Sequence, residues 1–174
     1  QDINKIDIKV LPDIKVITGL RRSGKSKLLD AYANILERET TNNVIRIPLH
    51  LKKYEKLRNG NDLYEYIDSK YYDNSNNYLL IDEIQMCQDF EETINSLHEE
   101  ERFDIYLTGS NAFLLSSDLA TLFGGRVFEI SMYPFSFKEY ALYKQISLTS
   151  LTTKAQANLK VALNDYLIQG GFPE

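Results

Sequence analysis

Five short and almost entirely apolar segments recur along this chain, and they constrain its fold more than any other feature. Continuous runs of this length, rich in β-branched and aromatic residues, are typical of strands that are covered on both faces, as in a parallel sheet. Helix-like spacing of apolar residues fills the intervals between them. The alternation predicts an α/β sandwich of three layers, helices on both faces of a sheet, without fixing the strand order. The five segments are 14–18, 44–48, 78–82, 104–108 and 127–131.

The helices expected between these strands carry local signals of their own. Asp62 and Glu65 have the spacing of a capping box, so we expect a helix to start there. The helix after the first strand is expected to bury one apolar face, made by Leu28, Leu29, Tyr32, Ile35 and Leu36.

The pattern changes after residue 131. Pro134 interrupts the chain, Ser136 and Glu139 form a cap pair for a short helix, and a last helix is expected over 154–168. We therefore divide the chain into an α/β core, 1–131, and a short helical appendage, 132–174. The sequence opens on Gln1 and closes on a turn after a helix cap, which we interpret as one domain of a longer chain.

Composition excludes several classes of protein. A single cysteine, Cys87, rules out a disulfide framework and a zinc site of four thiolates. No apolar run exceeds six residues, which argues against a membrane span, and no secretion signal opens the sequence, so we expect a cytoplasmic protein. The net charge of −5 argues against a broad nucleic-acid-binding surface on this chain.

Residues 19–26 fit the phosphate-loop pattern G-x-x-x-x-G-K-[ST] at every fixed position. An apolar strand precedes the loop and a helix follows it, so backbone N–H groups and the positive end of the helix would face a phosphate. Lys25 would reach the β- and γ-phosphates, and Ser26 would offer its hydroxyl to Mg²⁺. Whether Arg21 and Arg22 touch phosphate or a partner, or are simply solvated, stays open. Contacts with the ligand are expected from Gly19, Leu20, Arg21, Arg22, Ser23, Gly24, Lys25, Ser26 and Lys27.

Two carboxylates end the third apolar segment. Parallel strands present functional groups at their carboxyl ends, the edge where the phosphate loop also lies. Asp82 would hold the magnesium, through water, and Glu83 would orient and polarise an attacking water as the general base.

Three further residues are candidates with open alternatives. Ser110 or Asn111, after the fourth segment, would contact the γ-phosphate or the attacking water, or would cap the next helix. Arg126 is the last arginine of the chain, and it would either reach a neighbouring subunit's nucleotide or form a structural salt bridge. His50 is interpreted as a surface residue at a strand end, and Cys87 as a small buried or half-buried side chain.

The chain resembles the AAA+-type P-loop ATPases of the AAA_14 family, in which this domain is usually followed by a domain called DUF4143. The resemblance implies a P-loop NTPase fold with a five-stranded parallel sheet of order 5-1-4-3-2, and a nucleotide bound at Lys25, Ser26, Asp82 and Glu83. It also implies a missing C-terminal domain of the same chain as a partner, and a homo-oligomer is open. The resemblance is carried by residues 16–26, 79–85, 107–112, 125–126, 134–140 and 170–174.

From the motifs we predict a Mg²⁺-dependent nucleoside-triphosphate binder that hydrolyses its ligand by water attack on the γ-phosphate. ATP rather than GTP follows from the resemblance. One alternative is an ATP-dependent switch or scaffold with little turnover. A second is a small-molecule P-loop kinase, which would need an acceptor pocket.

Overall fold

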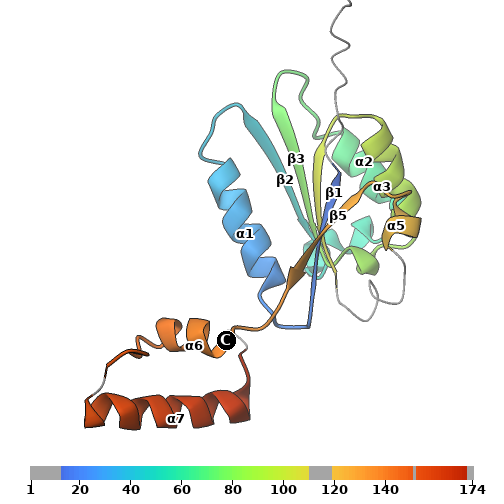
Figure 1. Cartoon of the computed structure of the whole chain (residues 1–174). Coiled ribbons are helices and arrows are strands. Elements are labelled where there is room, and N and C mark those ends of the chain that lie inside the picture. Colours follow the sequence, from blue (N-terminus) through green and yellow to red (C-terminus); the bar gives the residue numbers. More distant parts are fainter. Residues whose placement is uncertain (1–12, 110–118, 151, 172–174) are drawn as a thin grey trace, which may run out of the picture.

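A five-stranded sheet in which every neighbouring pair of strands is parallel forms the centre of the molecule (Figure 1). The structure is a computed structural model and describes residues 13–109, 119–150 and 152–171. The order β2-β3-β4-β1-β5 is the expected order, 5-1-4-3-2, counted from the opposite edge, so this prediction is confirmed. The strands, which include all five predicted segments, are β1 (Ile14–Gly19), β2 (Asn42–Pro48), β3 (Asn76–Asp82), β4 (Asp104–Thr108) and β5 (Val127–Met132).

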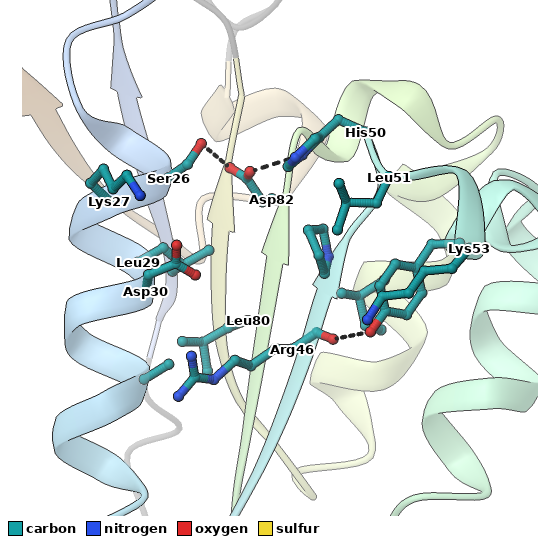
Figure 2. A pocket seen from close by; sticks show the side chains of 14 residues that line it. Ser26, Lys27, Leu29, Asp30, Arg46, His50, Leu51, Lys53, Leu80 and Asp82 are labelled. Atoms are coloured by element: carbon teal, nitrogen blue, oxygen red, sulfur yellow. Dashed lines mark hydrogen bonds and ion pairs between the residues drawn. The ribbon is translucent and has the colours of Figure 1, made fainter. Parts of the chain in front are cut away.

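One face of the sheet is covered by α1 (Lys25–Leu36), which follows directly from the loop after β1. Leu29 of this helix packs against Leu80 of β3, and both side chains are labelled in Figure 2. The buried positions of α1 are Lys25, Leu29, Ala33 and Leu36.

The apolar face predicted for this helix is partly wrong. Leu28 and Ile35 are 40% and 55% exposed. The loop turns Lys25, the first residue of the helix, inward. Leu29, Ala33 and Leu36 follow it at intervals of about one helical turn and therefore face the sheet as well. Leu28 and Ile35 lie to one side of that stripe.

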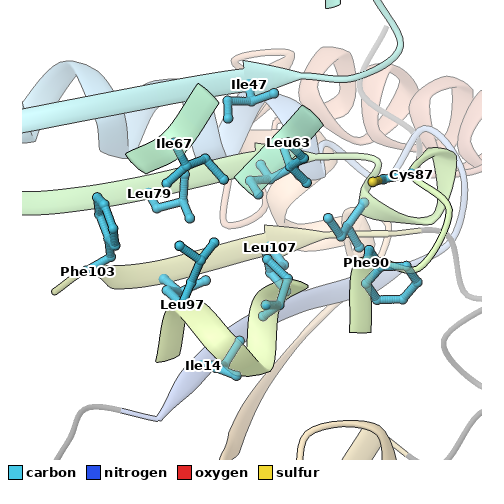
Figure 3. Packing of buried hydrophobic residues seen from close by; sticks show 14 of the residues in the cluster. Ile14, Ile47, Leu63, Ile67, Leu79, Cys87, Phe90, Leu97, Phe103 and Leu107 are labelled. Carbon is cyan, nitrogen blue, oxygen red and sulfur yellow. The ribbon is translucent and has the colours of Figure 1, made fainter. Parts of the chain in front are cut away.

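The other face carries the larger core. It is covered by α2 (Gly60–Asp68), α3 (Phe90–Glu99) and the short α5 (Leu119–Leu122). Two short 3-10 segments, η1 (Lys52–Leu57) and η2 (Ile84–Met86), join these elements to the strands. In Figure 3, Leu63 and Ile67 of α2 and Leu97 of α3 pack over Leu79 and Leu107 of the sheet, and all five side chains are fully buried. Continuous burial of this kind holds the central strands rigidly in register.

Two local expectations are corrected. The cap of α2 is Asn59, whose side chain accepts from the backbone N–H groups of Asn61 and Asp62, so the predicted pair Asp62 and Glu65 lies inside the helix. Asn is as good a cap as Asp and stands three residues earlier. Strand β5 is not covered on both faces, because it lies at the edge of the sheet, with Phe128 58% exposed.

After β5 the chain forms two helices, α6 (Phe137–Tyr143) and α7 (Thr153–Gln169), which pack against each other and project away from the sheet (Figure 1). The ring of Tyr166 lies 5.4 Å from the ring centres of Phe137 and Tyr140. The predicted capping box of Ser136 and Glu139 is present. Within the described ranges, no helix has both the length and the apolar character that crossing a membrane requires.

Candidate functional site

Four loops meet at the carboxyl-terminal ends of the strands, which all lie on the same side of the sheet because the strands are parallel. They follow β1, β2, β3 and β4, and they carry the phosphate loop, His50, Glu83 next to Asp82, and Gly109 after Thr108. Figure 2 shows Ser26 and His50 approaching Asp82 from opposite sides. The two motifs found in the sequence, the glycine loop and the acid pair, are therefore neighbours in space.

The loop between β1 and α1 has the backbone that its glycines allow. Gly24 caps α1 with φ 98°, and Gly19 has φ 149°. A Cβ on Gly19 would lie only 2.4 Å from the carbonyl oxygen of Met132 in β5, so a side chain does not fit there. The hydroxyl of Ser23 is buried and has no hydrogen-bond partner among the described residues. A tight loop at the start of a twelve-residue helix, with an unused buried hydroxyl, is suited to receive an anion.

Lys25 is folded into this loop. Its side chain is 5% exposed, and its Nζ donates to the carbonyl oxygens of Gly19 and Leu20, each at 2.9 Å. Burial lowers the pKa of Lys25, and the nearby charges of Glu83 and Asp82 oppose that shift. The ammonium is thus held within the loop by two of the loop's own carbonyl oxygens.

Asp82 is the most connected side chain of the site, although it is only 5% exposed. Its Oδ1 accepts from Ser26 Oγ at 3.0 Å and from the hydroxyl of Thr108. Its Oδ2 lies 3.3 Å from Nδ1 of His50. A carboxylate and a hydroxyl this close are the oxygen ligands that Mg²⁺ prefers, and Mg²⁺ commonly takes its remaining ligands from water and substrate phosphates. In the described part of the chain no group of three or more His, Cys, Asp or Glu residues could hold a metal by itself.

Glu83 leaves the strand in a left-handed conformation, with φ 59° and ψ 53°. Its backbone N–H donates to the hydroxyl of Thr108 at 3.0 Å, and its carboxylate accepts from the side-chain amide of Gln85. The two carboxylates have different partners: Asp82 contacts Ser26, Thr108 and His50, whereas Glu83 accepts from Gln85.

The loop side chains predicted to contact ligand divide into two groups. Ser23 and Lys25 are buried, and Gly24 and Ser26 are partly so. The side chains of Leu20, Arg21, Arg22 and Lys27 are exposed. The exposure of both arginines fits the solvated interpretation of Arg21 and Arg22.

Arg126 lies at the amino-terminal end of the parallel strands, whereas the phosphate loop lies at their carboxyl-terminal end. Its carbonyl oxygen accepts from the N–H of Ile14, where β1 begins, and the six residues of β1 separate it from the loop by roughly 16 Å. Its side chain is 54% exposed and lies 3.5 Å from Glu99. Arg126 therefore faces away from the phosphate loop of its own chain. Ser110 and Asn111 lie outside the described residues, and their role stays a prediction.

Sequence reasoning missed two members of this site. His50 is 47% exposed, as the surface interpretation predicts, but its ring contacts Asp82. Thr108 is fully buried, and its hydroxyl donates to the carboxylate of Asp82 and accepts from the backbone N–H of Glu83, although only the residues after it were taken as candidates. Thr108 is the last residue of β4, the same signal that identified Asp82 at the end of β3, whereas His50 lies two residues after the end of β2.

A cavity of about 530 Å³ adjoins the site between α1 and the end of β2. Ser26 and Asp82 form one end of its wall, and His50, Arg46 and Lys53 lie along it (Figure 2). The volume lies in the range of small-molecule sites.

The chain has relatives in bacteria and archaea. It is 37% identical over 172 residues to an uncharacterised protein of Haemophilus influenzae, covering 97% of this chain and 41% of that protein. It is 32% identical over 173 residues to an uncharacterised protein of Methanocaldococcus jannaschii, covering 97% of this chain and 38% of that one. The chain therefore spans about two fifths of the length of the curated relatives it matches.

Solved structures share the fold at low sequence identity. PCH-2 of C. elegans superposes with a TM-score of 0.60 at 16% identity, over 90% of this chain and 51% of that one. DnaA of Aquifex aeolicus bound to AMPPCP gives 0.53 at 16% identity, over 92% and 57%. Residues 12–141, most of the chain, match AAA_14, a family of AAA domains. With its phosphate loop and parallel sheet, the chain belongs to the AAA_14 family of AAA+-type P-loop ATPase domains.

Proposed function

We propose that this domain binds Mg²⁺-ATP at residues 19–26 and hydrolyses it by attack of water on the γ-phosphate. The observation that carries the proposal is the 3.0 Å contact between Ser26 Oγ and Asp82 Oδ1, with Glu83 next in sequence and Lys25 beside it. Family membership supports nucleotide binding. The similar fold of DnaA, which holds the nucleotide analogue AMPPCP, supports it as well.

The loop amides and Lys25 would bind the phosphate chain, while Ser26 and Asp82 would hold the metal. Mg²⁺, when bound, supplies charge neutralisation on the phosphate oxygens. Glu83 would accept a hydrogen bond from the attacking water and take its proton. For this, its carboxylate must exchange the amide of Gln85 for water.

Arg126 would act on a neighbouring molecule rather than on its own. Arg126 lies at the amino-terminal end of the strands, and its side chain is about half exposed. A cation at this position would reach a nucleotide bound by another subunit rather than one bound by its own chain. This proposal requires self-association. The greater length of the relatives supports a further domain of the same chain as a second partner.

The experiment that tests hydrolysis compares the wild type with Glu83→Gln in single-turnover assays with labelled ATP, alongside calorimetric titration of Mg²⁺-ATP. We expect Glu83→Gln to bind the nucleotide and to lose roughly 10²- to 10⁴-fold in rate. Glu92→Gln, an exposed glutamate on α3, is the matched control. Equal rates for the wild type and Glu83→Gln would remove Glu83 as the base and favour a nucleotide-dependent switch or scaffold.

The cavity beside the metal ligands favours one second candidate, transfer of the γ-phosphate to a small molecule. It adjoins Ser26 and Asp82 and is large enough for an acceptor. Incubation with labelled ATP and a metabolite extract separates the two functions: label released only as free phosphate excludes the kinase, and label on a metabolite supports it.

A further inference from the structure

We propose that Thr108 is a positioning residue that sets the geometry of the acid pair through its single hydroxyl. The inference rests on the proposed function and adds a residue to it. Thr108 is the last residue of β4, the strand that lies between β1, which leads into the loop, and β3, which carries the acids. It thus stands between the two halves of the site.

This hydroxyl forms one hydrogen bond with the carboxylate of Asp82 and one with the backbone of Glu83. Thr108 Oγ1 accepts from the backbone N–H of Glu83 at 3.0 Å and donates to Asp82 Oδ1 at 2.5 Å. A hydroxyl has one proton to donate and can accept as well, so one atom can fill both roles at once. The side chain is fully buried, and water has no access to replace it.

The bond to Glu83 acts on an unusual backbone. A left-handed conformation is uncommon for residues other than glycine, and it persists where the surroundings determine it. At Glu83 the N–H is fixed by Thr108, and the carbonyl oxygen accepts from the N–H of Met86 at 3.0 Å. Loss of the hydroxyl would release the first of these restraints, leave a buried N–H without a partner and let the general base turn away from its water.

The bond to Asp82 matters most once a metal binds. Ser26, which now donates to the same oxygen, would turn its lone pairs to the metal. Of the partners described for Asp82, Thr108 and His50 would then keep the carboxylate in place, and His50 is nearly half exposed. Thr108 is therefore the rigid contact, and it ties the metal ligand to the base.

The test compares Thr108→Val, which keeps the shape and removes the hydroxyl, with Thr108→Ser, which restores the hydroxyl. Thr93→Val is the matched control, because Thr93 is also buried and its hydroxyl donates to the carbonyl oxygen of Asp89, which caps α3. For each variant, kcat, KM for Mg²⁺-ATP, the Mn²⁺ affinity of the ATP complex and the melting temperature are measured. Thr108→Ala is measured in the same way, below its melting temperature, in case the valine variant does not fold.

We expect kcat of Thr108→Val to fall by roughly 10- to 100-fold, a part of the rate enhancement that a general base supplies. We expect KM to change by less than about threefold. Its Mn²⁺ affinity should fall, Thr108→Ser should stay within about threefold of the wild type in both quantities, and Thr93→Val should match the wild type. Wild-type kcat and Mn²⁺ affinity in Thr108→Val, or in Thr108→Ala where valine does not fold, would overturn the inference. So would a serine variant as impaired as the valine variant. If the wild type itself does not hydrolyse ATP, the proposed function fails, and the Mn²⁺ affinities alone decide the role of Thr108.

Discussion

Ser26 and Asp82 are 56 residues apart in sequence, yet Ser26 Oγ donates to Asp82 Oδ1 at 3.0 Å. Their strands are not neighbours, because β4 lies between β1 and β3. The contact forms because α1 starts at the carboxyl edge of the sheet and its first turn reaches across β4 to the end of β3. The strand order thus creates the site, because it places the start of α1 directly opposite a buried carboxylate.

Replacing Lys25 by alanine should abolish nucleotide binding while leaving the fold intact. The ammonium is the buried cation of the loop, and its hydrogen bonds go to loop carbonyls rather than to the core. We expect Mg²⁺-ATP affinity to fall by at least about 100-fold in calorimetric titration, as for the loss of a buried charged contact. Lys56→Ala, an exposed lysine on η1, is the control. Retained Mg²⁺-ATP affinity in the alanine variant would contradict the assignment of Lys25.

Much of the fold could be predicted from the sequence, because buried parallel strands and the phosphate loop each depend on a short contiguous pattern. The buried face of α1 could not be predicted in this way. It depends on the inward turn of Lys25, which is a property of the folded loop and leaves Leu28 and Ile35 exposed. The roles of His50 and Thr108 depend on which strands are neighbours, which the chain pattern alone leaves undetermined. The position of Arg126, by contrast, could have been predicted from the sequence. A residue that directly precedes a parallel strand lies at the amino-terminal end of the sheet, away from the phosphate loop.

As pH rises, the affinity for ATP should begin to fall at a lower pH than it would if Lys25 had the ordinary pKa of a lysine. Burial lowers the pKa of Lys25 in the free protein, whereas bound phosphate favours its protonated form. Affinity is therefore complete below the lowered pKa and is lost as pH rises through it. Calorimetric titrations at a series of alkaline pH values check this, with Lys25→Arg, whose charge does not titrate, as the reference. An affinity that stays flat until the ordinary lysine range would disprove the prediction.

Arg126→Ala should reduce ATP turnover only where the protein self-associates. The side chain faces away from its own loop, and its half-exposed contact with Glu99 adds little to stability. We expect a rate loss on the order of 10³-fold at high protein concentration, as for a cation acting in trans, and no loss in diluted monomer. Turnover measured across a dilution series, with association followed by light scattering, tests this. Arg38→Ala, another exposed arginine, serves as the control, and a loss that does not depend on concentration would exclude action in trans.

Gly19→Ala should destabilise the fold far more than Gly124→Ala, although both glycines have positive φ. A Cβ on Gly19 would meet the Met132 carbonyl oxygen at 2.4 Å, whereas a Cβ on Gly124 would meet nothing within 4 Å. We expect a loss in the free energy of unfolding of about 2–5 kcal/mol at Gly19, from backbone strain and steric overlap, and of about 1 kcal/mol at Gly124. Urea unfolding of the two variants makes the comparison, and equal losses would show that β1 and β5 separate to accept the methyl group.

Cys87 should make the stability of the protein depend on pH above 9. The thiol is 3% exposed, and burial, together with the charges of Asp89 and Glu91, raises its pKa from 9.0 to about 11. Because the folded pKa is raised, the stabilising contribution is complete below pH 9 and is lost as pH rises towards 11, where the unfolded chain carries a thiolate and the folded chain does not. Relative to Cys87→Ala, the wild type should lose on the order of 2 kcal/mol in the free energy of unfolding across that range. Urea unfolding of both proteins at pH 9, 10 and 11 measures the difference, and the contributions of the tyrosines and lysines, which both proteins share, cancel in it. A difference between the two proteins that stays constant with pH would mean that the thiol ionises as readily in the folded chain as in the unfolded one.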